Sequence, residues 1–430
     1  MDFKMEPRLE KRYEKLVRSH MQAGHQLAAG VKSILSEDSA FNQTQAAWRF
    51  FNNNQCTLEE LSQPLIKAAH ELSEQESDEY LLVPHDWSHL SYNSHKNSKK
   101  DIYNTFKKCR GYDLQSSLMI SDRHGGPLAL VAMNLKTKTQ TFSTYETGLE
   151  GLTHLEELSK RISWLESQNF HKSLVHIVDR EGDSVAFFRA LNNRNWLVRV
   201  NDKNTAYKDG LKRKLKEMIP ELVFTQARPV EYKGKIAEQL IAETTITITR
   251  PAQPMRKGTN GKRLPTVKGA PVNARLVVAK VVDNAGKELA VWYLLTNLFD
   301  VPASTIALWY YWRWSIENYF KLMKSAGMQL ESWQQTTGIA IARRLLVASM
   351  ACVCVWRIAH AKGPNAGELR KILIRLSGRQ MKWKKEFTCT ALCAGLWSLL
   401  SMQDLLENYS VDKIKSLISD VFGDKKIWNV

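Results

Sequence analysis

The sequence predicts a mixed α/β core that is flanked by helical segments and interrupted by a β-rich stretch. Residues 1–77, and the chain from Ser304 to its end, carry apolar side chains at the three-to-four spacing of helices. Between Tyr80 and Val200, short β-type runs come first in a hairpin and then alternate with helical runs. Within residues 201–300, two runs, Ala242–Arg250 and Ala274–Val282, alternate apolar and polar side chains at period two, which indicates strands.

The N-terminal segment is small, basic and helical. Gln45 to Asn53 place bulky aromatic side chains and an Arg on one short helix, and Thr57 is a typical N-cap for the helix that follows. A module of this kind is either a DNA-binding domain or a plain helical domain, and the residues alone leave both readings open.

The core is expected to form a mixed sheet. Its predicted strands are Tyr80–Val83, Ser117–Ile120, Leu128–Leu135, Leu174–Val178 and Trp196–Val200, and its predicted helices are Leu149–Gln168 and Asp183–Leu191. The turn Arg123–Gly126 joins the second and third strands. In the β-rich stretch the predicted strands are Ala242–Arg250, Ala274–Val282 and Glu288–Thr296, and Pro251–Gly269 is predicted to be a mobile basic loop.

The chain carries a large positive charge. Its 430 residues include 61 Lys and Arg against 44 Asp and Glu, a formal net charge of +17. This excess fits a nucleic-acid partner better than a membrane surface, although a merely basic protein has the same composition. The most apolar run, Leu345–Trp356, is too short to span a bilayer, so we expect a buried helix and no membrane partner. The six Cys show no zinc-binding spacing and predict reduced thiols in a cytoplasmic protein.

One predicted helix, Ala303–Ala326, carries four functional side chains on one face. Tyr310, Arg313, Glu317 and Lys324 lie at offsets of zero, three, seven and fourteen residues, so they project to the same side. The carboxylate is suited to a metal ion and the cations to phosphate oxygens. A solvent-exposed stripe of charges has the same pattern.

Two aspartates follow apolar runs in the core. Asp86 comes after LLVP and Asp179 after LVHIV, where open α/β sheets bind their ligands, and each also suits a turn. Together with Glu317 they form a set of three carboxylates that can hold two hard cations for phosphodiester chemistry.

These residues resemble a known family. The pattern Tyr-x2-Arg-x3-Glu-x6-Lys, here Tyr310 to Lys324, is similar to the signature of bacterial insertion-sequence transposases with a DDE triad, in the Tn-five-like branch. The segments DREGDSVAFF and LLVPHDWSHLSY resemble those that carry the two catalytic aspartates of that family. EPRLEKRYEKL and QAAWRFFNNNQCTLEEL resemble its helical DNA-end-binding domain, so the likeness runs from about Glu6 to about Leu346.

The resemblance implies an RNase H-like core with a β insertion, and cut-and-paste transposition that uses Mg²⁺, or Mn²⁺. It implies that Asp86, Asp179 and Glu317 are the catalytic metal ligands. It also implies three kinds of DNA contact. Tyr310, Arg313 and Lys324 would contact phosphates, and Arg199 would assist beside the second Asp. Trp292 would stack on a base that is flipped out during hairpin formation. A Trp in a strand is also a common core residue, so both readings of Trp292 stay open.

The resemblance also implies a domain order and partners. We expect a DNA-end-binding domain at 1–77, the core at 78–200 and 301–365, the β insertion at 201–300, and a helical domain at 366–430. Its amphipathic helices, Gly395 to Val421, serve either dimerisation or capping of the core. The partners would be double-stranded DNA, as transposon ends and target, and a second copy of the chain when DNA is bound.

The sequence departs from the family beside the first aspartate. His85 stands where an acid is common, and Trp87 where a small hydroxyl residue is common. His85 and His89 are also compatible with a transition-metal site, although no third ligand is evident. Two other functions remain: an inactive or domesticated DNA-binding relative, and an RNase H-like nuclease or resolvase.

Overall fold

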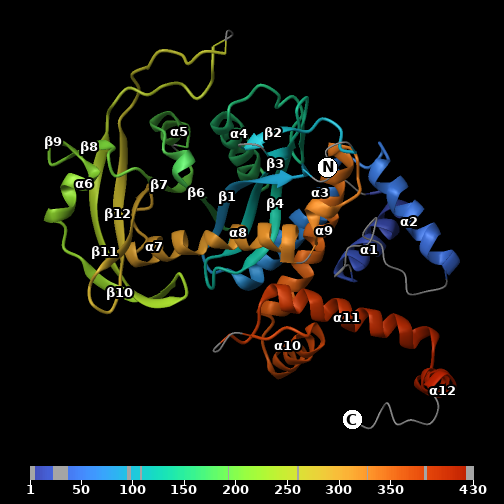
Figure 1. Ribbon diagram of the computed structural model, residues 1–430. Helices are drawn as coiled ribbons and strands as arrows, with labels where there is room; N and C mark the ends of the chain where they lie inside the picture. Colours follow the sequence, from blue (N-terminus) through green and yellow to red (C-terminus); the bar gives the residue numbers. More distant parts are fainter. Residues whose placement is uncertain are drawn as a thin grey trace. The chain divides into compact units, whose positions relative to one another are not determined.

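The computed structural model describes residues 5–22, 37–93, 98–106, 109–191, 193–258, 261–326, 328–381 and 385–422. It divides into two compact units (Figure 1). Residues 62–89 and 103–319 form what we call the sheet unit, and residues 1–61, 90–102 and 320–430 form the helical unit.

The sheet unit is built on one mixed sheet of thirteen strands. The strands are β1 Tyr80–Ser91, β2 Tyr103–Phe106, β3 Cys109–Ser121, β4 Pro127–Lys136, β5 Thr141–Ser143, β6 Ser173–Val178, β7 Asn195–Val200, β8 Thr205–Lys208, β9 Leu211–Lys214, β10 Thr225–Tyr232, β11 Lys235–Ile248, β12 Val272–Val282 and β13 Glu288–Thr296. The order across the sheet is β5-β4-β3-β1-β6-β7-β13-β12-β11-β8-β9, with β2 paired to β3 and β10 to β11.

The direction of the strands changes along this sheet. The pairs β1–β6 and β6–β7 are parallel, whereas β3–β4, β4–β5 and the pairs from β7–β13 to β11–β8 are antiparallel. Residues 201–300 therefore continue the sheet of the core rather than form a sheet of their own. Within them the basic loop after β11 is held by two bridges, Ala252 to Val267 and Lys257 to Arg263.

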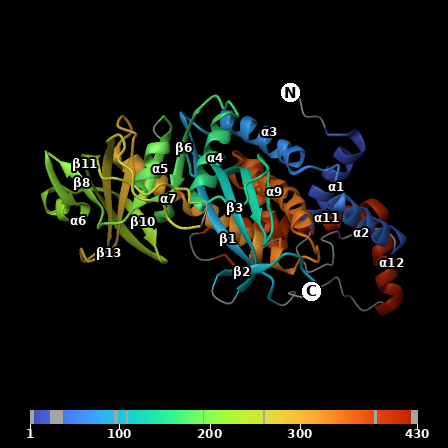
Figure 2. The ribbon, with the colours of Figure 1, turned by 90° about the horizontal axis from the view of Figure 1, so that it is seen from above.

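Helices α4 and α5 are among those that pack against this sheet (Figures 1 and 2). Helix α4, His154–Glu166, begins later than its sequence pattern indicates, because Thr153 and Glu156 form a capping box at its N-terminus. Helix α5 is Val185–Ala190. Their apolar faces join one core cluster with strands β7, β11 and β12, in which the rings of Phe188 and Trp196 stack with centroids 5.1 Å apart. Short helical turns occupy η2 Arg180–Gly182, α6 Leu215–Met218 and η3 Ile219–Glu221.

The expected long helix from Ala303 to Ala326 is interrupted. Helix α7, Ala303–Trp312, ends at Arg313, and α8 runs from Trp314 to Lys321 before a π-helical turn at Leu322–Ala326. Arg313 keeps right-handed helical dihedral angles (φ −50°, ψ −31°), so the helical path continues through the interruption. Pattern alone did not reveal this break, because no Pro or Gly marks it.

The helical unit is organised around helix α9, Gly338–His360, which packs against α1, α2 and α11. Its other elements are α1 Pro7–Gln22, α2 Glu37–Asn52, the start of α3 Leu58–Glu76, η5 Leu330–Ser332, α10 Pro364–Ser377, α11 Cys389–Asn408 and α12 Val411–Phe422. The capping box predicted at Thr57 forms with Glu60. Buried Arg343 of α9 donates to the carbonyls of Cys56 and Phe51, at 2.8 and 2.9 Å.

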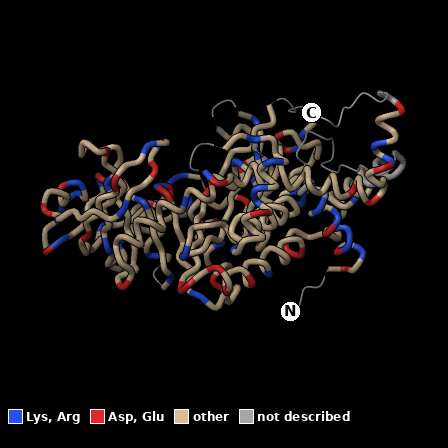
Figure 3. The backbone as a smooth tube through the Cα atoms, turned by 90° about the horizontal axis from the view of Figure 1, so that it is seen from below, with Lys and Arg blue, Asp and Glu red and all other residues tan. Residues whose placement is uncertain are grey.

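Two helices of this unit are long and apolar enough to cross a membrane, judged by length and composition alone. Helix α9 is longer than the apolar run at its centre, and 83% of its most apolar window is buried within the protein, as in the core helix of a soluble protein. Of the most apolar window of α11, 22% is buried within the protein. Lys and Arg are spread along the whole tube of Figure 3, so the excess positive charge is not confined to one element.

The turn between β3 and β4 supports the helix that carries Arg313 and Glu317. Gly125 adopts a positive φ of 68°, its carbonyl accepts a hydrogen bond of 2.8 Å from Ser315, and a Cβ atom there would overlap the ring of Trp312. The Gly125→Ala variant should therefore have a lower free energy of unfolding. A left-handed residue other than Gly costs about 1–2 kcal/mol, and the clash with Trp312 costs about 1–3 kcal/mol more.

Chemical unfolding of the Gly125→Ala and Gly148→Ala variants measures the two costs. Gly148 has a similar φ of 72° with open space around its Cβ position, so its variant should show only the backbone cost. Equal losses in the two variants would mean that the Trp312 contact does not constrain this turn.

Candidate active site in the sheet unit

Asp86 and Asp179 lie side by side because of the register of two parallel strands. Strands β1 and β6 pair from Tyr80 with Ser173 to His85 with Val178, so each aspartate is the next residue beyond the last pair. The sequence pattern placed Asp86 at the end of its strand. Strand β1 continues to Ser91, however, so Asp86 lies within the strand. The pairing of β1 with β6 ends at His85 and Val178, so Asp86 and Asp179 still lie together where that pairing ends.

The guanidinium of Arg313 joins three carboxylates. Its Nη1 atom lies 2.9 Å from Oδ2 of Asp86. Its Nη2 atom lies 3.0 Å from Oε1 of Glu317 and 3.4 Å from Oδ2 of Asp179. Arg313 is only 4% exposed, whereas the carboxylate side chains are 19–35% exposed. We call these four residues the carboxylate cluster.

The electrostatics of the cluster follow from burial and from this one cation. Burial raises the pKa of Asp86 and of Glu317, and the charge of Arg313 partly opposes the rise for both. Burial by itself would lower the pKa of Arg313, but Tyr310 and the three carboxylates outweigh it and the net pKa is raised. The guanidinium therefore stays charged and holds the acids together.

Asp179 has further partners on its other oxygen. The hydroxyl of Tyr310 donates to Oδ1 at 3.2 Å, and Nη1 of Arg199 lies 3.5 Å from the same atom. Burial is the main cause that raises the pKa of Tyr310 to about 12, so the phenol keeps its proton and donates it. The ring of Trp292 lies 6.3 Å from that of Tyr310, at an interplanar angle of 53°, and Trp292 is half-buried beside Val281.

Seven of the eight residues singled out from the sequence thus form one connected group within the sheet unit. Lys324 is the exception, because it belongs to the helical unit, where its Nζ lies 3.7 Å from Oε1 of Glu331. Burial lowers the pKa of Lys324, and Glu331 opposes the decrease.

Whether these residues fit a divalent cation can be judged from their donor atoms. Within the described ranges no group of three or more His, Cys, Asp or Glu is arranged to hold a metal ion. In this structure the guanidinium of Arg313 pairs with oxygens of all three carboxylates. Carboxylate oxygens that are partly open to solvent are the type of donor that Mg²⁺ prefers, so the chemistry of the donor set fits the ion.

Several neighbours of the cluster could not be recognised from the sequence. Glu181 lies two residues after Asp179. Burial is the main cause of the raised pKa of Asp86, and the negative charge of Glu181 raises it further. Oε2 of Glu181 lies 3.2 Å from Nε2 of His154. The ring of Trp87 lies 5.3 Å from that of His154. No spacing in the sequence indicates these contacts, since they join strand β1, helix α4 and the turn after β6.

His85 and His89 do not share a ligand-like arrangement. His85 bonds to Ser117 and to His176, at 2.8 and 3.0 Å, and burial lowers its pKa far below the usual range. His89 bonds instead to Asp113. The two rings have separate partners, which leaves the transition-metal reading without support.

Comparison with known families identifies the chain. A family model described as the transposase DDE domain matches residues 78–354, which is more than half of the sequence. The chain belongs to the DDE transposase family. All seven residues of the connected group lie within the matched range, as does Lys324. A search of curated proteins finds no match.

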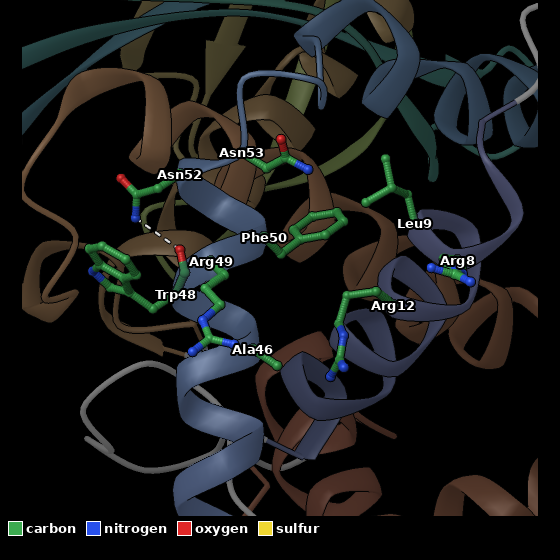
Figure 4. Close-up of a pocket in the computed structure, with 9 residues that line it drawn as sticks. All are labelled: Arg8, Leu9, Arg12, Ala46, Trp48, Arg49, Phe50, Asn52 and Asn53. Atoms are coloured by element: carbon green, nitrogen blue, oxygen red, sulfur yellow. Dashed lines mark hydrogen bonds between the residues drawn. The ribbon is translucent and has the colours of Figure 1, made fainter.

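The helical unit holds a second surface of interest, outside the matched range. A pocket of about 670 Å³ between α1 and α2 is lined by Arg8, Leu9, Arg12, Ala46, Trp48, Arg49, Phe50, Asn52 and Asn53 (Figure 4). The side chains of Leu9, Arg12 and Phe50 point into the space between the helices, whereas Trp48 projects to the other side and is 60% exposed. Three Arg beside exposed aromatic and amide groups suit a nucleic-acid contact.

The central place of Arg313 can be tested through stability. The Arg313→Met variant leaves three carboxylates close together without their cation, so we expect it to lower the free energy of unfolding by about 3–5 kcal/mol. Chemical unfolding at neutral pH in EDTA measures this loss. The matched control is Arg199→Met, which removes the ion pair between Nη1 of Arg199 and Oδ1 of Asp179 at 3.5 Å. Both side chains are partly exposed, so the free energy of unfolding should fall by about 1 kcal/mol at most. Similar losses in both variants would show that Arg313 does not hold the cluster.

Proposed function

We propose that this DDE transposase moves an insertion sequence by metal-dependent cut-and-paste transposition, with end nicking, hairpin formation and strand transfer. The observation that carries the proposal is the convergence of Asp86, Asp179 and Glu317 on one guanidinium, inside the matched domain. These residues come from three separate parts of the chain, so their meeting is not a consequence of local sequence. The complete carboxylate set also argues against an inactive DNA-binding relative.

We infer that the catalytic core is RNase H-like and that the chain is of the Tn-five-like branch. Support comes from the strand directions, because the antiparallel strands β3 and β4 lie on one side of β1 and the parallel strands β6 and β7 on the other. The signature residues, including the spacing to Lys324, support the branch.

The carboxylates of Asp86, Asp179 and Glu317 would hold Mg²⁺, or Mn²⁺. When bound, such ions activate the attacking oxygen and stabilise the leaving oxygen. Arg313 is charged and lies among the three acids, so it would turn from the carboxylates to a phosphate oxygen. Tyr310 would orient Asp179 and contact the same backbone, with Lys324 and Arg199 as further phosphate contacts.

The partners follow from the same proposal. Double-stranded DNA would contact the sheet unit at the cluster, and transposon ends would contact the α1–α2 pocket with its three Arg. The two halves of a cut-and-paste reaction act on two ends, which supports a homodimer on DNA, with α11 and α12 as the proposed dimerisation segment. Six free Cys support a cytoplasmic location.

Replacement of Glu317 by Gln tests the metal-ligand role. Gln keeps the size of the side chain but removes its charge, so strand cleavage of DNA that flanks the coding region should fall by at least about 100-fold, a loss typical for an essential catalytic group. DNA binding should stay within a few-fold of the unchanged chain. A gel assay with Mg²⁺ or EDTA measures both, with the exposed Glu288→Gln as control. Equal loss of cleavage and binding would remove Glu317 from the metal site.

Replacement of Trp292 by Ala tests the hairpin step. If the indole stacks on a flipped base, its loss should leave first-strand nicking but lower the yield of hairpin ends, since the extruded base loses about 1–3 kcal/mol of stacking. Denaturing gels separate the nicked and hairpin products. An unchanged hairpin yield would mean that Trp292 is only a packing residue beside Val281.

A further inference from the structure

The segment that joins β11 to β12 is strongly basic. Every charged residue between Glu243 and Asp283 is a Lys or an Arg. We call residues 251–269 the basic arm, of which the structure describes 251–258 and 261–269. In Figure 1 this segment, drawn in yellow, extends well beyond the ends of the two strands that it joins. Its cationic side chains are all exposed: Arg256, Lys257, Lys262, Arg263 and Lys268.

The two limbs of the basic arm are bonded to each other. Ala252 and Val267 exchange backbone hydrogen bonds of 3.0 and 2.8 Å. Further along, Lys257 forms a β-bridge to Arg263. The arm therefore pairs both at its base and toward its tip, whereas its composition, rich in Gly and Pro, predicted a loop without such pairing.

Helix α5 clamps the base of the arm through one side chain. Nη2 of Arg189 donates to the carbonyls of Arg250 and Gly269, at 3.0 and 3.3 Å. Nε of the same residue donates to the carbonyl of Ala270 at 2.9 Å. Arg250 precedes the arm and Gly269 ends it, so one guanidinium holds both limbs together.

A second anchor joins the arm to helix α4. The hydroxyl of Thr153, the N-cap of that helix, donates to the carbonyl of Met255 at 2.8 Å. The side chains of Met255 and Ala252 pack against the core cluster of the sheet unit. The apolar groups of this limb thus face the protein, and the cations of the arm face the solvent.

The charge of the arm is not neutralised within the protein. Among the described residues, Arg256, Lys257, Arg263 and Lys268 have no Asp or Glu as partner. Like charges on one short hairpin repel each other, so this arrangement opposes folding until a polyanion relieves it. The arm has no aromatic side chain, so it offers contacts to phosphates and not stacking on bases.

We propose that the basic arm binds the phosphate backbone of double-stranded DNA without reading its sequence. This contact rests on the transposase function proposed above and adds a DNA surface outside the carboxylate cluster. A backbone that is held in advance loses little entropy when DNA binds, and each cation that meets a phosphate releases a counterion. A membrane is a poorer partner, because stable binding there also needs buried apolar groups and Met255 already packs against the core.

The salt dependence of DNA binding tests this contact with the full chain in EDTA. The probe is a fluorescently labelled DNA duplex of arbitrary sequence, whose anisotropy gives the binding constant at each salt concentration. Each phosphate contact contributes about 0.9 to the slope of log K against log salt concentration, so the loss of four contacts should make the slope shallower by about 3–4. The arm variant combines four substitutions: Arg256→Gln, Lys257→Gln, Arg263→Gln and Lys268→Gln.

The control variant removes the same charge elsewhere in the sheet unit. Its slope should change by about 1 at most. Both variants alter exposed side chains only, so they should unfold at the same denaturant concentration as the unchanged protein. The control combines four substitutions of exposed lysines: Lys138→Gln, Lys216→Gln, Lys235→Gln and Lys287→Gln.

The possible outcomes separate the arm from the general function. A shallower slope in the arm variant alone supports the contact. An unchanged slope in the arm variant, or an equal change in both variants, would overturn the role of the arm and leave the transposase function standing. Failure of the unchanged protein to bind DNA at all would overturn the transposase function and the arm contact with it.

Discussion

Three ionised carboxylates in a small volume repel one another unless a cation lies among them, and in this protein the guanidinium of Arg313 is that cation. Two like charges about 4 Å apart repel by about 4 kcal/mol at the effective dielectric constant near a protein surface. Repulsion among Asp86, Asp179 and Glu317 would therefore oppose folding. Arg313 is buried and makes three ion pairs, so it balances this repulsion in the protein alone. Under the proposed function, the guanidinium would compete with a divalent ion for these oxygens, and a DNA phosphate would offer it another partner.

The register of β1 and β6 sets the other half of the site. A shift of one residue would turn one aspartate to the opposite face of the sheet. That register is fixed by buried residues such as Leu82 and Val175, and by the buried chain from Ser117 through His85 to His176, whose two hydrogen bonds measure 2.8 and 3.0 Å. His85, which departs from the pattern of the family, therefore has a structural role beside the first aspartate. Polar groups buried within the sheet hold the two strands in the one alignment that brings the acids together.

Aromatic rings occur near the cluster as well as cations. The ring of Tyr310, whose hydroxyl donates to Asp179, contacts that of Trp292. Phosphate contacts by cations position a nucleic acid without reading it, whereas ring stacking requires a base to leave the duplex. Under the proposed function, the site would use both kinds of contact.

Helical and strand periodicity and the Tyr–Arg–Glu–Lys spacing are local properties, so they were enough to predict the element types, the catalytic candidates and the family. The sequence predicted β13 at its observed bounds and β6 and β7 to within one residue, but it ended β1 at Val83, whereas the strand continues to Ser91. Only the tertiary structure decided that Arg313 lies among all three acids, that the helix is interrupted there, and that residues 201–300 extend the core sheet. It also decided that Glu181, His154 and Trp87 meet beside Asp86. Contacts between residues far apart in the chain depend on strand register and burial, which a local pattern does not encode.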